Sequence, residues 1–238
     1  MTIGARQLLD LVDDLEPLEP LARGVALWHA VEPERSVESL WRAPVGCRDR
    51  ALLDLRASAI GPTLELGHAC PRCGEQVEFP VEVATLRLPT ADFANPPFDL
   101  VAGERRFRLR HVCSADLVAA ARDPGAELLL RCIVADSAAD LPGQAPPLSA
   151  EQRETIDAAL AAGDPQADIV FGLDCPACEE HWSALLDIGE VVWAELQQRA
   201  RRLLAEVDLL ARVYHWSERE ILELSAARRR RYLELVAS

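Results

Sequence analysis

The chain has 238 residues, half of them hydrophobic, so it is long enough for one large domain or two small domains with a real core. Its formal net charge is -14 and all 25 basic residues are Arg, which disfavours a general affinity for nucleic acid phosphates because such binding needs a basic surface. No stretch is long and apolar enough to span a bilayer, and the first residues lack the basic start and apolar run of a secretory signal. We therefore expect a cytoplasmic protein without a membrane partner, in which free thiols stay reduced.

The N-terminal part of the sequence predicts helices. Leucines at helical spacing mark residues 5–30, and a proline-containing break divides this stretch into two helices. A turn is expected at residues 44–46, followed by a helix over residues 48–59 that a Gly-Pro pair closes.

The middle of the sequence predicts short strands around two Cys-Pro-x-Cys turns. The β-like segments are residues 63–67 and 76–83 around the first turn, and residues 168–173 and 182–188 around the second. Between them we expect a Pro-rich loop over residues 85–103, a half-buried strand over 105–112, helices over 114–122, 125–135 and 149–162, and a loop over 140–147.

The most specific pattern is the pair of Cys-Pro-x-Cys turns, which share one plan at an offset of 105 residues. Cys70 and Cys73 form the first pair, and Cys175 and Cys178 form the second. An apolar strand enters each turn and a second strand leaves it, so two thiolates can point at one cation. Two such turns complete a tetrahedron of sulfur ligands about 2.3 Å from a zinc ion. Because four sulfur ligands leave no open position, we predict one structural Zn²⁺ ion rather than a catalytic metal.

Other interpretations of the two turns stay open. Residues 74–174 intervene, which is far more than in a compact zinc ribbon, so a shared ion requires an inserted lobe. The two pairs could instead be unrelated reduced thiols, or turns that have lost their metal. A dithiol redox site is less favoured, because a redox Cys-x-x-Cys opens a helix beside a βαβ unit and both turns here lie between strands.

Buried packing is expected of the three remaining cysteines, Cys47, Cys113 and Cys132, since buried free cysteine is common. His111 precedes Cys113 at a spacing that could bind metal, but this pair alone is an incomplete site. His68 and His181 flank the two turns, and a solvated or hydrogen-bonded state is expected for both rather than a ligand role.

From residue 189 to the end, the chain is expected to be helical over residues 189–215, 217–224 and 226–236. An apolar heptad stripe covers three heptads of the first segment: Trp193, Leu196, Ala200, Leu203, Val207, Leu210 and Tyr214. Such a stripe either covers the core of its own domain or offers a seam to a partner helix. Ser217 and Glu220 then match a capping box at the start of a new helix.

Aromatic and Arg residues gather near the C-terminus, where residues 190–238 hold 9 Arg against 8 acidic residues. Aromatic anchors beside Arg are typical of binding hot spots, and Arg binds carboxylates with two parallel hydrogen bonds. A run of four Arg is also typical of a solvated helix face. We predict a partner-binding site formed by Tyr214, Trp216, Arg228, Arg229, Arg230, Arg231 and Tyr232.

Several motifs occur along the chain in a fixed order: PVGCRDR running into LLDLR, the two Cys-Pro-x-Cys turns, DPQAD, and the terminal YHWSEREILELSAARRRRYLELV. By these motifs, nearly the whole chain resembles proteins encoded in phage-like contractile injection system clusters and known as T-even-phage-type baseplate hub assembly chaperones. The resemblance implies a factor that helps to assemble a tail or baseplate, with a baseplate, hub or tape-measure protein as its partner.

The predicted fold is α+β, with a small zinc-ribbon-like β unit, an inserted strand-plus-helix lobe, and helical N- and C-terminal regions. The expected regions are residues 1–62 (helical), 63–84 (first zinc knuckle), 85–163 (inserted lobe), 164–188 (second zinc knuckle) and 189–238 (helical). The expected function is non-enzymatic protein binding during assembly of a contractile injection system. A structural component of the finished baseplate is the second candidate, and a nucleic-acid-binding zinc ribbon, which the acidity disfavours, is the third. No catalytic residue is predicted, because no Gly-rich phosphate loop, Ser-His-Asp arrangement or open metal site is visible.

Overall fold

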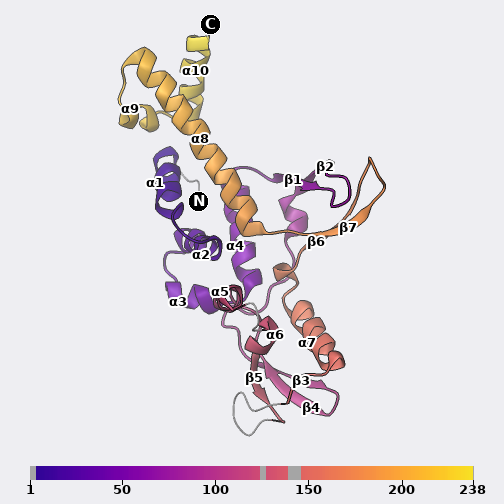
Figure 1. Ribbon diagram of the computed structural model, residues 1–238. Helices are drawn as coiled ribbons and strands as arrows, with labels where there is room; N and C mark the ends of the chain where they lie inside the picture. The colour runs from indigo at the N-terminus through magenta and orange to yellow at the C-terminus, as the bar shows by residue number, and fades with distance from the viewer. Residues whose placement is uncertain (1–3, 124–126, 139–145, 238) are drawn as a thin grey trace.

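The computed structural model describes residues 4–123, 127–138 and 146–237, and it confirms the predicted α+β class. Figure 1 shows a helical body from which a two-hairpin arm, a lobe with a small sheet, and the end of one long helix project in different directions. Within these residues, no helix has both the length and the apolar character needed to cross a membrane.

The N-terminal body contains four helices: α1 (Ala5–Leu15), α2 (Pro20–Val31), α3 (Val37–Arg42) and α4 (Val45–Ala59). The two helices predicted within residues 5–30 are confirmed. Proline stands in the first turn of α2, where its missing N–H has no intrahelical acceptor to lose. The short α3 was not predicted, although Ser36 caps it by accepting a hydrogen bond from the Ser39 backbone N–H at 3.2 Å.

Helix α4 begins at Val45, so the turn predicted over residues 44–46 is wrong. Pro44 is the extended residue before the helix. The Gly46 N–H, which has no partner within the first helical turn, donates to the Asp164 carboxylate at 2.9 Å. The acceptor that completes this helix start is 118 residues away in the sequence, so no local signal marks it.

The long helix α8 (Ile188–Tyr214) contributes many of the residues of the main hydrophobic core. Its heptad stripe is buried from Trp193 to Leu210, with Leu196 and Leu210 fully covered, and ends at the half-buried Tyr214. The helix packs on α1, α2 and α4. The stripe therefore covers the core of its own chain, and the alternative of a seam for a partner helix is wrong for these residues.

Two shorter helices follow, α9 (Glu218–Glu223) and α10 (Ala226–Ala237), and both pack on α8. His215 ends α8 in the left-handed conformation, with φ 56°. The predicted capping box is confirmed, since Ser217 accepts from the Glu220 N–H at 3.3 Å and Glu220 accepts from the Ser217 N–H at 2.8 Å.

The arm consists of two antiparallel hairpins: β1 (Thr63–Ala69) with β2 (Gln76–Glu82), and β6 (Val170–Asp174) with β7 (His181–Leu185). Each hairpin is a separate two-stranded sheet. Apolar residues at the base of the arm, including Leu64, Leu66 and Ile169, join the main core. The 3₁₀ helix η1 (Val83–Leu86) follows β2, and η2 (Pro165–Ala167) precedes β6.

The lobe contains a three-stranded sheet in the order β3 (Phe98–Ala102), β4 (Arg105–Leu109), β5 (Ile133–Asp136), together with α7 (Ala150–Gly163). A second core of Ala102, Phe107, Leu109, Leu148 and Ile156 holds it together. Helix α5 (Ser114–Arg122) packs instead on α2 and α3 of the body, and α6 (Leu128–Arg131) lies between α5 and α7. The predicted helices over 114–122 and 149–162 are confirmed, and the strand predicted over 105–112 forms over its first part, Arg105–Leu109.

Two predictions in the lobe are wrong. The Pro-rich segment 85–103 is not only a loop, because its end forms β3, paired antiparallel with β4. The helix predicted over 125–135 is shortened to α6 and followed by β5, because this segment pairs with β4 as an edge strand. A short apolar run fits a strand and a helix equally well, so the tertiary partner decides. Most of the loop predicted over 140–147 lies outside the described residues.

Candidate metal centre

The two Cys-Pro-x-Cys turns have the same backbone geometry. In the first, the Cys70 N–H donates to the Glu75 carbonyl at 2.8 Å and the Gly74 N–H donates to the Cys70 carbonyl at 2.9 Å. The second repeats both hydrogen bonds, from Cys175 to Glu180 at 2.8 Å and from Glu179 to Cys175 at 3.0 Å. The repeat deduced from the sequence is thus also a structural repeat.

The fourth residue after the first cysteine of each turn adopts the left-handed conformation. Gly74 has φ 79° and Glu179 has φ 59°. Glycine accepts this conformation readily, whereas a residue with a Cβ pays for it. The second turn keeps the geometry without glycine, which indicates that the neighbouring structure holds it in place.

The four sulfur atoms converge where the tips of the two hairpins meet. The Sγ atoms of Cys70 and Cys178 are 3.6 Å apart, those of Cys73 and Cys175 are 3.5 Å apart, and all four lie within 4.8 Å of one another. A tetrahedral zinc with bonds of about 2.3 Å places its sulfur ligands about 3.8 Å apart, so the observed set fits such an ion. Among the described residues, no other group of three or more His, Cys, Asp or Glu side chains is arranged to hold a metal.

The electrostatics of the cluster favour a bound cation. Burial opposes ionisation of Cys70, yet hydrogen bonds from the backbone of Cys73 and Arg72 and from nearby thiols lower the pKa of its thiol to about 7. For Cys178, the backbone N–H of Glu180 stabilises the thiolate, but burial and the three neighbouring sulfurs together raise its pKa to about 12. Neighbouring thiolates repel one another, and a bound cation offsets this repulsion.

Other contacts join the hairpins beside the sulfurs. Arg72 lies 3.6 Å from the Glu180 carboxylate and donates to the Cys178 carbonyl at 3.4 Å. Phe79 and Phe171 pack edge to face, with ring centroids 5.4 Å apart. The sequence prediction missed the Arg72–Glu180 pair, for which the only signal was an opposite charge in each turn.

The two flanking histidines are not ligands. His181 lies against Asp174, with Nδ1 to Oδ1 at 2.9 Å, and His68 stacks on Phe79. Both point to neighbours within their own hairpins, as the expectation of a hydrogen-bonded or solvated state implied.

The three other cysteines lie outside the cluster and are free. Cys132 is fully buried, and burial raises the pKa of its thiol to about 12. Burial likewise raises the pKa of Cys47 to about 11, and its thiol donates to the Ala91 carbonyl at 3.4 Å. Cys113 donates to the Asp116 carboxylate at 3.0 Å. Nearby His111 stacks on Phe98 with ring centroids 5.0 Å apart, so the two residues that could have bound metal serve packing instead.

The structure brings the three predicted aromatic anchors together. Tyr214 stacks on Trp216 with centroids 4.7 Å apart, and Tyr232 meets them edge-on at 5.4 Å and 4.9 Å respectively. All three are half-buried and pack against the main core. The three aromatic rings therefore fix the end of α8 to α10, and only part of each ring remains accessible.

The Arg run divides into two kinds of residue. Arg229 is 7 % exposed, pairs with Glu206 at 3.0 Å and donates to the Leu224 carbonyl at 2.9 Å. It is held inside its own chain, which corrects the prediction that it contacts a partner. Its neighbours in the run are exposed: Arg228, Arg230 and Arg231.

No protein-family model, curated protein or solved structure matches this chain. Functional conclusions therefore depend on the chain's own residues, among which the four clustered cysteines form the most specific arrangement.

Proposed function

We propose that Cys70, Cys73, Cys175 and Cys178 hold one structural Zn²⁺ ion. The observation that carries this proposal is the convergence of four sulfurs within 4.8 Å from two turns of equal geometry. Thiolates select zinc among the common cellular cations, and four of them complete its shell. When bound, the ion supplies cohesion to the arm, and no position remains open for a substrate.

We further propose that the protein is a non-enzymatic, cytoplasmic binding factor that assists assembly of the baseplate or tail of a phage-like contractile injection system. The support is the resemblance carried by the sequence motifs. Two of those motifs meet in space, because PVGCRDR contains Gly46 and DPQAD begins with Asp164, and these two residues are hydrogen-bonded. The partner is a baseplate, hub or tape-measure protein, and the acidity of the chain argues against nucleic acid.

The zinc part of the proposal is tested by elemental analysis of the full chain purified without chelator. We expect about one zinc per chain, and loss of that zinc in Cys175→Ser. Cys47→Ser is the matched control, since Cys47 is half-buried and outside the cluster, and it should keep the metal. Wild-type protein without zinc would contradict the proposal.

The assembly role is tested by expressing the gene cluster with this chain tagged. We expect a baseplate, hub or tape-measure protein to co-purify with it, and particles to be incomplete when the chain is deleted. Its absence from finished particles identifies a transient factor, and its presence identifies a stable baseplate component. Normal particles in the deletion strain would overturn the role.

A further inference from the structure

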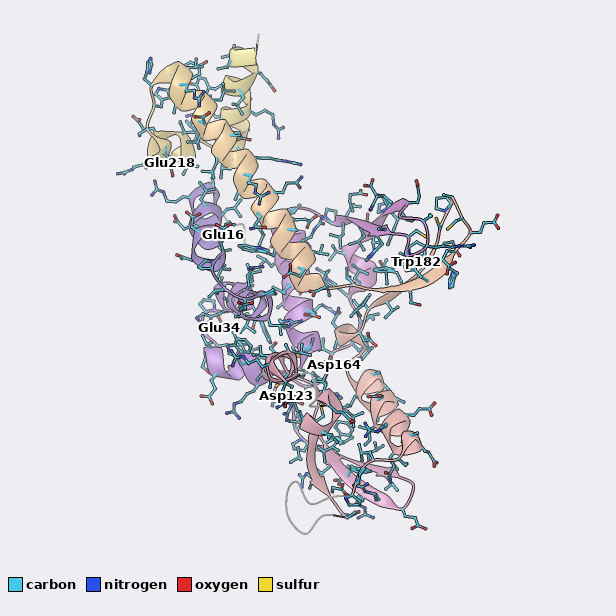
Figure 2. The ribbon with its side chains drawn as sticks, viewed as in Figure 1. Glu16, Glu34, Asp123, Asp164, Trp182 and Glu218 are labelled. Carbon is cyan, nitrogen blue, oxygen red and sulfur yellow. The ribbon has the colours of Figure 1, made fainter. Side chains whose placement is uncertain are left out.

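A groove of about 720 Å³ lies between α8, the α9–α10 turn, α10 and the start of α1. Figures 1 and 2 show α10 lying beside the end of α8, with α1 below them. One face of α8 lines it with Arg199, Arg202 and Leu203, and one face of α10 lines it with Arg230 and Leu233. This volume is within the range of pockets that hold small ligands or several side chains, about 300–1,000 Å³.

The groove combines an apolar floor with a positive rim. Leu8, Leu203 and Leu222 are buried beneath the floor, whose accessible apolar surface comes from half-buried side chains: Ile60, Leu224 and Leu233. The rim residues Arg202 and Arg230 are exposed. An apolar floor next to guanidinium groups suits an amphipathic protein segment better than a phosphate backbone, which offers no apolar surface.

The charge of the groove is positive because both acidic side chains that line it are already paired. Glu195 accepts two hydrogen bonds of 2.8 Å from Arg56, and Glu206 accepts one from Arg229. In contrast, none of three lining guanidinium groups has a carboxylate partner among the described residues: Arg199, Arg202 and Arg230. In a chain of net charge -14, this is a local reversal of sign.

We infer that this groove docks an acidic amphipathic segment of a partner protein, with its carboxylates on Arg202 and Arg230 and its apolar side chains on the apolar floor. The inference rests on the proposed protein-binding function and adds the chemistry of the bound segment. Arg forms paired hydrogen bonds with carboxylates, so two guanidinium groups on facing helices fix the register of the segment. The half-buried side chains of the floor, Ile60, Leu224 and Leu233, offer apolar surface that the segment can bury.

The direct test uses a fluorescein-labelled amphipathic peptide of about 18 residues, with Leu on one face and Glu on the other, and a counterpart in which Arg replaces Glu. Fluorescence anisotropy with the zinc-loaded full chain measures binding. We expect the acidic peptide to bind about tenfold or more tightly than the basic one, and to weaken when NaCl rises from about 50 mM to about 300 mM. Equal binding of the two peptides would overturn the inference.

Replacing groove arginines by glutamate tests whether the acidic peptide binds in the groove. We expect Arg202→Glu with Arg230→Glu to weaken binding of the acidic peptide about tenfold or more, without unfolding, because neither side chain has an ion-pair partner within the described part of the chain. The matched control reverses Arg106 and Arg108, two exposed arginines on β4 of the lobe, and should bind as wild type. Unchanged binding in the groove variant would refute the inference.

Two other occupants of the groove, a second copy of the chain and nucleic acid, would give different results in these experiments. A wild-type dimer that the groove variant dissociates in sedimentation would assign the groove to a second copy, and competition by duplex DNA would assign it to nucleic acid; either outcome overturns the inference. The proposed assembly role fails separately, when no tail protein co-purifies although the peptide binds. If a tail protein co-purifies equally with wild type and groove variant, the role stands and the groove inference falls.

Discussion

Asp164 accepts hydrogen bonds from the backbone N–H groups of Gly46, at 2.9 Å, and of Ala91, at 3.1 Å, and it is 4 % exposed. One carboxylate thus joins the start of α4, the segment after η1, and the end of α7. Figure 2 labels Asp164 where the body meets the lobe. A Cβ at position 46 would lie 2.0 Å from Oδ1 of Asp164, so only glycine lets the carboxylate come this close to the start of α4.

Gly46→Ala should therefore lower the free energy of unfolding by about 3 kcal/mol, because the carboxylate must move and two buried N–H groups lose their acceptor. Urea denaturation measures the change. Gly24→Ala in α2 is the matched control: its Cβ would meet Arg48 at an ordinary 3.6 Å, and the helix should gain up to about 1 kcal/mol. Equal effects of the two variants would contradict the contact described.

The two left-handed positions in the Cys-Pro-x-Cys turns, Gly74 and Glu179, should respond to substitution in opposite ways. Gly74→Val should cost about 1–2 kcal/mol, because a residue with a Cβ is strained at φ 79°. Glu179→Gly relieves the same strain at φ 59°, so it should be neutral or stabilise by up to about 1 kcal/mol. Thermal melting and zinc retention against a competing chelator measure both, and a loss of zinc in Glu179→Gly would show that its side chain matters.

Arg229→Gln should destabilise the chain by about 2 kcal/mol, because Glu206 loses its partner and the Leu224 carbonyl loses a donor. Arg231→Gln, in the same run but exposed, should stay within about 0.5 kcal/mol of wild type. Chemical denaturation distinguishes them. If both variants melt alike, the run acts as one solvated face.

Trp216→Ala should cost about 3 kcal/mol, since the ring packs against two tyrosines and the core. Tyr232→Phe keeps the ring contacts and should change stability by less than about 1 kcal/mol. A Trp216→Ala protein that melts as wild type but loses its partner would make this residue a binding anchor rather than a packing residue.

Stability should fall in acid partly through Asp116. Burial raises the pKa of this carboxyl, but hydrogen bonds from Arg110 and Cys113 outweigh burial and hold it below the ordinary 3.8. A lowered folded-state pKa contributes stability above the unfolded value and loses it as pH falls through the folded value. We therefore expect the difference in unfolding free energy between wild type and Asp116→Asn to shrink as the pH falls from about 6 to about 3. A constant difference would exclude this origin.

Helical spacing and the repeated turns were enough to predict most of the architecture and which four cysteines cluster. Each signal was local: the leucine periodicity of α1, the capping box at Ser217, and the matching surroundings of Cys70 and Cys175. The start of α4 was missed because its acceptor comes from Asp164, and β5 was missed because pairing with β4 overrides the local preference.

The groove lay beyond sequence reasoning for a similar reason. Arg202 and Arg230 are 28 positions apart, and their shared surface exists only because α10 packs beside α8. The internal pairing of Arg229, which separates it from its three neighbours, depends on the same fold. The charge composition of the sequence does not show which Arg side chains are paired with a carboxylate in the folded chain.

The four clustered cysteines bring together positions on either side of residues 74–174, so an ion bound by all four would close the intervening chain into a ring. For a covalent cross-link, closing a loop of about 100 residues corresponds to about 4.7 kcal/mol of lost entropy in the unfolded chain. A zinc ion at the tip of the arm would act as a reversible version of such a link. It would therefore change the stability of the lobe, whose residues it never touches, and a chelator would open the ring without breaking a bond of the chain.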